Sequence, residues 1–219
     1  MSSQEPKWEK GHEGSHSWCG YYRPLKEGFR PSGGRRANDD HTHEFKVQQE
    51  FLGLKPIGDE DHPWLVSLHN DPLVLRNLTD PQPITIDSHM KWWESIRNNT
   101  KQLRFIFTVN GIPAGLTKFY DIDDNNGCCM LGADLHKDFR EKGLAKPMWR
   151  LMLNLCFETM NLHRVSLTTA QFNVPAQRVY SGLGFKEEGR LVQSLFRDGQ
   201  YYDQILMYML RSDWNHVKP

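Results

Sequence analysis

A turn that could bind an anion lies at residues 140–145, where the sequence reads REKGLA. It follows an apolar run at residues 128–135 and precedes a segment with helical spacing, so it joins a predicted strand to the start of a predicted helix. Gly143 lets the backbone approach a ligand closely, and the N–H groups of a first helical turn have no partner within the helix. With Arg140 and Lys142 they favour phosphate. The alternative is a tight turn whose amides face water.

A second group of residues stands downstream of that turn. Asn173, Ala176 and Tyr180 fall at i, i+3 and i+7, so they share one face of a predicted helix, and Gly184 and Phe185 follow at its end. Each residue alone is ordinary: a helix cap, a packing alanine, a half-buried tyrosine and a C-terminal glycine. Their position after the turn, in the order strand, helix, strand, helix, favours a shared ligand.

Hydrophobic periodicity and turn residues predict the elements that position these groups. Asn110-Gly111 and Asp198-Gly199 each predict a hairpin, because a type I′ turn needs positive φ at both central residues. A mixed α/β sheet with helices on both faces follows from the order of the elements. The predicted strands are residues 51–57, 103–109, 114–120, 128–135, 165–170, 191–197 and 201–210. The predicted helices begin near Asp59, Thr85 or Asp87, Gly143 and Asn173, and the first of them ends before Asp71-Pro72. On the second helix Ile86, Met90, Trp93 and Ile96 or Arg97 share a face at helical spacing.

Composition limits the class of protein. At 219 residues and 38% hydrophobic, the chain can bury one substantial core. Lys plus Arg and Asp plus Glu both number 27, and this balance offers no general attraction to nucleic acid or an anionic membrane. No apolar run approaches the ~20 residues that cross a bilayer, and the N-terminus MSSQEPKWEK lacks the apolar centre of a signal peptide. We expect a cytoplasmic protein with neither a nucleic-acid nor a membrane partner.

Residues 1–43 are rich in Gly, Ser, His and charge and show no hydrophobic period, which predicts a flexible polar arm before a single domain at residues 44–219. Aromatic residues in the arm could dock on the domain or on a second subunit, so a homodimer is possible. His12, His16 and Cys19 have a spacing that zinc could use. No second ligand pair stands at a matching spacing, and we expect no metal.

The two motifs resemble those of the GNAT superfamily of acetyl-CoA-dependent N-acetyltransferases. REKGLA matches the family's (Q/R)xxGx(G/A) motif, and NVPAQRVYSGLGF at residues 173–185 matches its NxxAxxxYxxxGF segment. The resemblance runs from Phe51 to Leu210. It implies a mostly antiparallel sheet of roughly six or seven strands, splayed between the fourth strand (residues 130–135) and the fifth (residues 165–170). Acetyl-CoA is then the co-substrate, with its pantetheine arm in that gap.

The resemblance also implies which residues hold the coenzyme. Leu135 and Lys137 would lie along the pantetheine, with a backbone N–H near Leu135 polarising the thioester carbonyl. Asn173 would hold the coenzyme arm. The pyrophosphate would contact the backbone amides of Arg140, Lys142, Gly143, Leu144 and Ala145.

Direct attack of a primary amine on the thioester follows, with Tyr180 near the sulfur to protonate the leaving thiolate. An amine with a pKa near ~10 must first lose a proton. Many relatives place a Glu for this on the fourth strand, where this chain has Met130, and some place one on the fifth, where it has Thr168. Asp134 and His136 share the strand face of Met130 by alternation, and either could act as the base. Both could equally be sheet-end residues with no catalytic task.

The acceptor is predicted less closely. SHMKWW resembles a segment of enzymes that acetylate nucleotide-linked amino sugars, so His89 and Trp92 could contact the substrate, as could Tyr201 on the last hairpin. Surface packing is the alternative for His89 and Trp92. The C-terminal part resembles ribosomal-protein, spermidine and small-amine acetyltransferases equally well. We rank a small-molecule amine first and a protein N-terminal or lysine amine second, with a non-catalytic acyl-CoA-binding module as a third reading.

Overall fold

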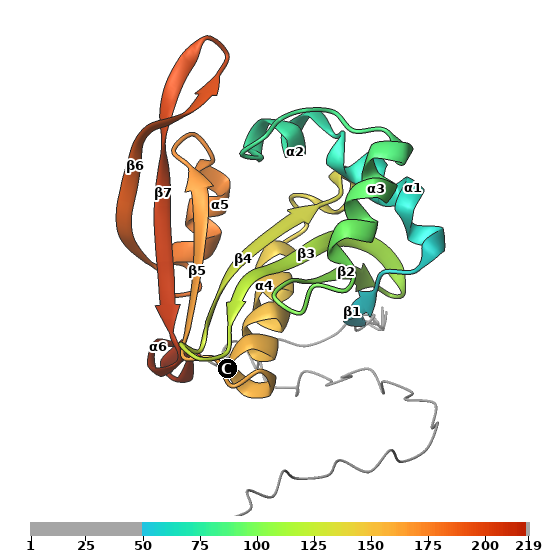
Figure 1. Cartoon of the computed structure of the whole chain (residues 1–219). Coiled ribbons are helices and arrows are strands. Elements are labelled where there is room, and N and C mark those ends of the chain that lie inside the picture. Colours follow the sequence, from blue (N-terminus) through green and yellow to red (C-terminus); the bar gives the residue numbers. More distant parts are fainter. Residues whose placement is uncertain (1–49, 218–219) are drawn as a thin grey trace, which may run out of the picture.

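A seven-stranded mixed sheet forms the centre of the computed structural model, which describes residues 50–217 (Figure 1). The strand order is β1-β2-β3-β4-β5-β7-β6, and within these residues only β4 and β5 pair in parallel. The predictions for residues 1–43 lie outside the described residues. The strands are β1 (Leu52–Pro56), β2 (Leu103–Val109), β3 (Ile112–Asp123), β4 (Cys128–Leu135), β5 (Arg164–Ala170), β6 (Lys186–Arg197) and β7 (Gln200–Leu210).

Both predicted hairpin turns are confirmed. Asn110 and Gly111 join β2 to β3 with φ of 52° and 80°, and Asp198 and Gly199 join β6 to β7 with φ of 52° and 78°. Positive φ at both central residues matches the right-handed twist of the strands that each turn connects. The β6–β7 hairpin extends past the rest of the sheet in Figure 1.

Three helices precede the first hairpin: α1 (His62–His69), α2 (Pro72–Asn77) and α3 (Ile86–Ile96). Helix α2 corrects the sequence prediction, which took Asp71-Pro72 only as the end of a helix. Asp71 caps α2 by accepting hydrogen bonds from the N–H groups of Leu73 and Val74, at 3.0 and 3.2 Å. Proline then occupies the first helical position, where its missing N–H has no consequence. The last helix, α6 (Arg211–Val217), was also not predicted.

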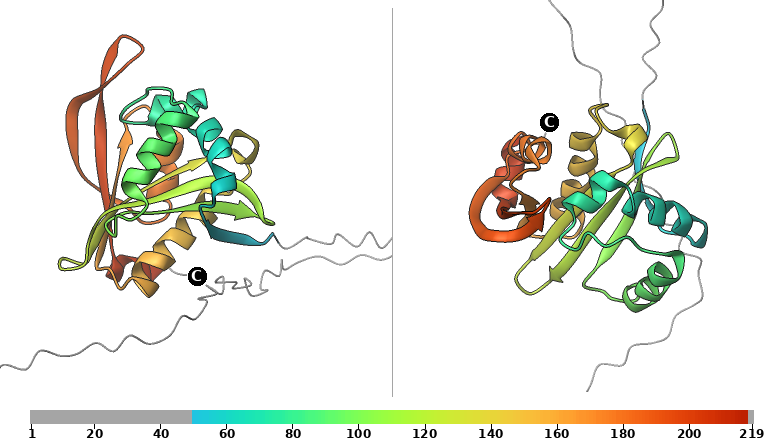
Figure 2. Two further views of the ribbon diagram at one scale, coloured as in Figure 1. Left: turned by 45° about the vertical axis from the view of Figure 1, so that its right-hand side comes forward. Right: turned by 90° about the horizontal axis from the view of Figure 1, so that it is seen from above.

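Alternation along β4 assigns its side chains to two faces of the sheet. The Sγ of Cys129 lies 3.8 Å from the Sγ of Cys156, which follows α4 (Ala145–Asn154). Met130, Gly132 and Asp134 therefore point to the opposite face. Figure 2 shows α1 and α3 on one side of the sheet and α4 on the other, as predicted.

Helix α4 begins directly after Gly143, and its apolar side chains recur at helical spacing. Met148, Trp149, Met152 and Leu153 are at most 3% exposed and belong to the core. Burying a side chain of this size stabilises the fold by about 1.5–3 kcal/mol. The turn at residues 140–145 is thus attached to a helix that packs into the core.

The splay between the fourth and fifth strands is confirmed. Strands β4 and β5 pair only at residues 128–130 against residues 164–166. Beyond these three pairs β4 continues to Leu135 and β5 to Ala170, while β5 stays paired with β7 along its other edge. Figure 1 shows the two strands diverging above their paired ends. Backbone groups on the facing edges are left without a strand partner there.

Candidate functional site

The turn between β4 and α4 offers main-chain N–H groups to a ligand. Glu141 and Gly143 have φ of 61° and 76°, and a Cβ on Gly143 would meet no atom within 4 Å. Position 143 therefore favours glycine for its backbone conformation and not for lack of space. Leu144 occupies the N-cap of α4, and its apolar side chain cannot accept a hydrogen bond from the N–H groups of the first helical turn. A turn of this kind can bind phosphate through its backbone.

Arg140 uses its side chain inside the protein. Its Nε donates to the carbonyl oxygen of Leu135 at 3.0 Å, and its second terminal nitrogen donates to Oδ1 of Asp71 at 2.8 Å. Asp71 is the residue that caps α2, so Arg140 joins the coenzyme-binding turn to that helix. The sequence assigned its cation to phosphate, and in the structure Nε and one terminal nitrogen of that cation are bound within the protein.

The contact with Arg140 changes the pKa of Asp71. Burial by itself would raise the pKa of Asp71, but hydrogen bonds from Arg140 and Val74 and the charge of Arg140 outweigh it, and the pKa is lowered. The carboxylate is therefore held in its charged form at neutral pH.

The backbone N–H of Leu135 is directed toward the splay. His136 donates its N–H to the carbonyl of Ala114 at 2.9 Å, and Leu135 pairs with Gly115 in the antiparallel register. Hydrogen-bonded and non-hydrogen-bonded pairs alternate along such a ladder, so the polar backbone groups of Leu135 point away from β3, toward β5. This is the orientation that a thioester-polarising amide needs.

Tyr180 lies on α5 (Val174–Ser181) and is 9% exposed. Its ring packs edge-on against Trp149, with centroids 4.8 Å apart. Burial, followed by the nearby Asp134 and Tyr120, raises the pKa of Tyr180 well above its ordinary value. Among the described residues none hydrogen-bonds its hydroxyl group, so this proton is held and remains available to a ligand.

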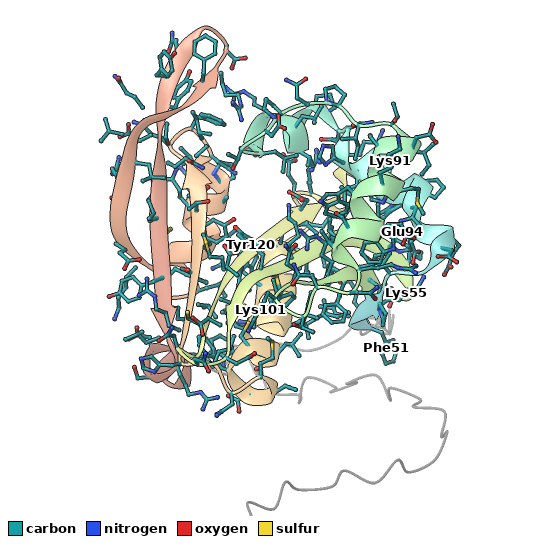
Figure 3. The ribbon with its side chains drawn as sticks, viewed as in Figure 1. Phe51, Lys55, Lys91, Glu94, Lys101 and Tyr120 are labelled. Atoms are coloured by element: carbon teal, nitrogen blue, oxygen red, sulfur yellow. The ribbon has the colours of Figure 1, made fainter. Side chains whose placement is uncertain are left out.

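Asp134 does not stand alone on the opposite face of β4. Its Oδ2 accepts a hydrogen bond from Nζ of Lys118 on β3 at 2.6 Å, in an ion pair whose side chains are 15% and 20% exposed. Tyr120 stands two residues further along β3, opposite Met130. Burial, then the charge of Asp121, raises the pKa of Tyr120. Figure 3 labels Tyr120 beside the divergence of β4 and β5.

His136, the second residue predicted as a base, has other contacts. Its ring stacks on Trp64 of α1 with centroids 6.0 Å apart, and its Nδ1 accepts a hydrogen bond from the N–H of Asp138 at 3.4 Å. The charge of Asp134 contributes to the raised pKa of Tyr180, whereas the ring of His136 contacts Trp64 and Asp138. Lys137 is exposed at the start of a short 3-10 helix, and Nζ of Lys142 lies over a phenylalanine ring.

Asn173 caps α5, as the sequence predicts. Its Oδ1 accepts a hydrogen bond from the N–H of Ala176 at 3.3 Å. The side-chain N–H₂ of Asn173 has no acceptor among the residues that the structure describes, so it is free to bind a coenzyme while the oxygen caps the helix.

The three residues predicted to contact the substrate, His89, Trp92 and Tyr201, have different surroundings in the structure. His89 is 5% exposed and shares a 3.0 Å hydrogen bond with His62 of α1. It packs α3 onto α1, and it takes the place on the buried face that the sequence gave to Ile86, which is 43% exposed. Trp92 is exposed and lies over Arg104 of β2 at 5.0 Å. Tyr201 packs on another aromatic ring near the end of the β6–β7 hairpin and is exposed.

Among residues 50–217, no group of three or more His, Cys, Asp or Glu side chains is placed so that it could hold a metal ion. His12, His16 and Cys19 lie outside the described residues. In the same part of the chain no helix is long and apolar enough to span a membrane.

A family profile described as "Acetyltransferase (GNAT) domain" matches residues 52–186, which is more than half of the chain. The chain is a member of the GNAT acetyltransferase family. It is 31% identical over 171 residues to the uncharacterized N-acetyltransferase YokL of Bacillus subtilis, covering 76% of this chain and 95% of that protein. The spermidine N(1)-acetyltransferase of Escherichia coli K12 is 25% identical, with 74% and 87% covered.

The fold of this acetyltransferase agrees with solved structures. A spermidine N-acetyltransferase from Vibrio cholerae in complex with CoA and spermine has a TM-score of 0.69 and 24% identity, and covers 75% of this chain and 98% of its own. Family and relatives identify this GNAT protein as an acetyl-CoA-dependent N-acetyltransferase. The splay, the free amide edge and the uncapped turn fit acetyl-CoA as the co-substrate.

Sequence reasoning missed three polar side chains on the sheet face that carries Asp134. Arg104, Lys118 and Tyr120 stand at alternate positions in apolar strands, a signal that marks one sheet face by its polar side chains. The register across β2, β3 and β4 is what aligns this face with Asp134.

Proposed function

We propose that this acetyltransferase transfers the acetyl group from acetyl-CoA to the primary amine of a small molecule by direct attack at the splayed edge of β4. The observation that carries the proposal is Tyr180, a buried residue at the splay whose ring packs on Trp149 and whose hydroxyl has no hydrogen-bond partner among the described residues. Acetyl-CoA supplies the activated acyl group when bound. The chain supplies the positions and the protons.

Two groups of the chain would act on the thioester, one on its carbonyl oxygen and one on the sulfur that leaves. The N–H of Leu135, directed away from β3, would donate to the carbonyl oxygen as negative charge develops there. Tyr180 would donate its proton to the thiolate. The raised pKa of Tyr180 keeps that proton on the hydroxyl at neutral pH, while a thiol with a pKa near ~8.5 leaves more readily once protonated.

The acceptor amine must also lose a proton, and Asp134 is the group proposed to take part in this step. Asp134 is the carboxylate that the fold brings to this face, in place of the absent glutamate at Met130. Its ion pair with Lys118 fixes the carboxylate through Oδ2 and leaves the other oxygen, Oδ1, without a hydrogen-bond partner among the described residues. We assign it the task of accepting a hydrogen bond from the incoming ammonium and passing its proton to water.

The acceptor class rests on two further supports. The segment around Trp92 favours a nucleotide-linked amino sugar, because it resembles the corresponding part of such enzymes. The spermidine acetyltransferases among the relatives favour a polyamine instead. Both are small molecules with primary amines, so both belong in the same assay.

The test is release of CoA thiol with a panel of amines: nucleotide-linked amino sugars, spermidine, amino acids and a peptide with a free N-terminus. Tyr180→Phe should lower kcat for the accepted amine by roughly 10²-fold and leave the KM for acetyl-CoA little changed. Tyr202→Phe is the matched control, since that tyrosine is on the β6–β7 hairpin. Unchanged turnover in Tyr180→Phe removes Tyr180 from the mechanism.

We also infer self-association of the acetyltransferase. Large apolar side chains on the β6–β7 hairpin are exposed, with Val192 74% and Phe196 55% accessible. A V. cholerae spermidine N-acetyltransferase of the same fold is described as dodecameric. Light scattering should give at least a dimer, and Val192→Lys should reduce the mass. A monomeric wild-type protein contradicts this proposal.

A further inference from the structure

Arg104 of β2 is a half-buried cation whose Nε is fully buried, and it has no carboxylate partner among the described residues. No ion pair joins it to any acidic side chain of the described residues. Its only hydrogen bond there runs from one terminal nitrogen to Oε1 of Gln102 at 2.9 Å, and its Nε is buried with no partner. A guanidinium has five N–H donors, so most of them lack a protein acceptor.

Partial burial disfavours the charged form of the Arg104 guanidinium. Burial lowers the pKa of Arg104, and the nearby Tyr120 offsets only part of this. Cations are rarely taken out of water without a partner, because desolvation disfavours the charged form. Trp92 of α3 lies over the guanidinium and supplies a weak cation–π contact in place of an anion.

Arg104 lies in register with the reaction centre. It pairs with Lys118 on β3, which pairs with Gly132 on β4, so the three positions form one row across the sheet. A Cβ added to Gly132 would lie 3.3 Å from the end of the Lys118 chain and 3.7 Å from the ring of Tyr120. Strands are about 4.8 Å apart, so Arg104 starts roughly 10 Å from the edge of β4.

The net charge of this row is positive. Lys118 is neutralised by Asp134, with 2.6 Å between Nζ and Oδ2. The charge of Arg104 is left over, and neither Tyr120 nor Trp92 can offset it. A polycation would be repelled at this face, whereas a phosphate or carboxylate would complete the hydrogen bonds of the guanidinium.

We infer that Arg104, beside Trp92, binds an anionic group of the acceptor, so that the acetyltransferase acts on an amine that carries a phosphate or carboxylate several bonds from its nitrogen. The inference rests on the proposed N-acetyl transfer at the β4 edge. Arg104 then selects among amines, and Asp134 and Tyr180 handle the protons. Trp92 provides a flat apolar surface for the part of the acceptor between the two groups.

The test compares amines that differ only in the anion. Glucosamine 6-phosphate is measured against glucosamine, 5-aminopentanoate against pentylamine, and spermidine separately, each by CoA release. The wild-type enzyme should prefer the anionic member of at least one pair by tenfold or more in kcat/KM, through KM. The preference should weaken with added salt, because partly exposed charges are screened.

Variants of Arg104 test whether this residue causes the preference for anionic amines. Arg104→Gln should lower kcat/KM for the preferred anionic amine by about 10- to 100-fold and leave its neutral partner within about twofold, as for one charge-assisted contact. Arg104→Lys should fall between, since it keeps the charge but loses the planar fork. Lys101→Gln is the matched control: it removes an exposed cation that pairs with Asp124, and all preferences should remain.

Two kinds of failure are distinguishable. If the wild-type enzyme acetylates neutral amines or spermidine as well as the anionic ones, or if Arg104→Gln lowers both members of a pair alike, Arg104 does not select an anion. If no amine releases CoA, the proposed reaction fails. Calorimetric titration of the same pairs into enzyme saturated with CoA then decides the inference by itself, since equal binding of both members overturns it without any turnover. Melting temperatures of the variants identify a folding defect.

Discussion

The proposed coenzyme-binding side and the proposed acceptor side of this acetyltransferase are built by different means. The turn at residues 140–145 and the edge of β4 offer main-chain amides, whose positions follow from local backbone conformation. The acceptor face offers side chains of Arg104, Lys118 and Asp134 from three strands, aligned only by sheet register. Main-chain recognition suits a co-substrate shared by a whole family, whereas side chains can change with each acceptor.

The largest effect is expected on the acceptor side, from Asp134→Asn. Asparagine keeps the size of the side chain but cannot accept the proton of the amine, so kcat should fall by roughly 10²-fold while the KM for acetyl-CoA stays constant. Asp121→Asn, which changes an exposed carboxylate on β3, is the control and should have no effect. Full activity of Asp134→Asn would mean that the proton leaves by another route, with His136 the next candidate.

The next effect should appear only on the coenzyme side. Gly143→Val forces a β-branched side chain into φ of 76°, which distorts the turn and should raise the KM for acetyl-CoA about tenfold. The KM for the amine should not change. Gly111→Val makes the same backbone change at φ of 80° in a remote hairpin, so it should lower the melting temperature without altering either KM. Equal kinetics of both variants would show that the turn does not hold the coenzyme.

A smaller effect is expected where the two sides meet, at Asp71. Asp71→Asn keeps a helix cap but weakens the 2.8 Å contact to Arg140, so the KM for acetyl-CoA should rise about two- to fivefold. The folded pKa of Asp71 lies below its ordinary 3.8, so its stabilising contribution is present above pH 3.8 and is lost as the pH falls below it. Thermal melts of both proteins should therefore converge in strong acid. A difference that persists there would place the effect outside the carboxylate.

The smallest effect concerns the packing of α1 on α3. Burial, then His62 and His69, lowers the pKa of His89 below its ordinary 6.5, so the folded state favours its neutral form. That stability is complete above pH 6.5 and declines as the pH falls below it, which should lower the melting temperature by about 2–4 °C. His89→Gln should flatten this decline, and His163→Gln, on an exposed residue, should not. Identical pH profiles for all three proteins would contradict the assignment.

Much of the fold followed from local rules. The Asn110-Gly111 and Asp198-Gly199 turns, the Asn173 cap and the start of α4 after Gly143 depend on neighbouring residues, and the structure has each of them. Helix α2 was missed because it is only six residues long, too short for a hydrophobic period to appear. Its one signal, the capping Asp71, was read as the end of the preceding helix.

The site divides in the same way. Tyr180 was predicted because its motif lies on one helix, and in the structure it is buried against Trp149. His89 was expected near the substrate, together with Trp92, because SHMKWW resembles a segment of amino-sugar acetyltransferases, yet a second histidine 27 residues away in the chain holds it in the interior. Helical spacing gives the angle between two side chains but not which of them faces another helix.

The sequence by itself determined the family, the co-substrate and the conformation of the turn at residues 140–145, because backbone conformation at Gly143 and the capping at Asn173 are set within a few residues. Only the tertiary structure decided that the guanidinium of Arg140 is used inside the protein, that Lys118 pairs with Asp134, and that Arg104 keeps an unmatched charge. These contacts join strands and helices distant in the chain, and their partners depend on register and packing, which no local pattern encodes.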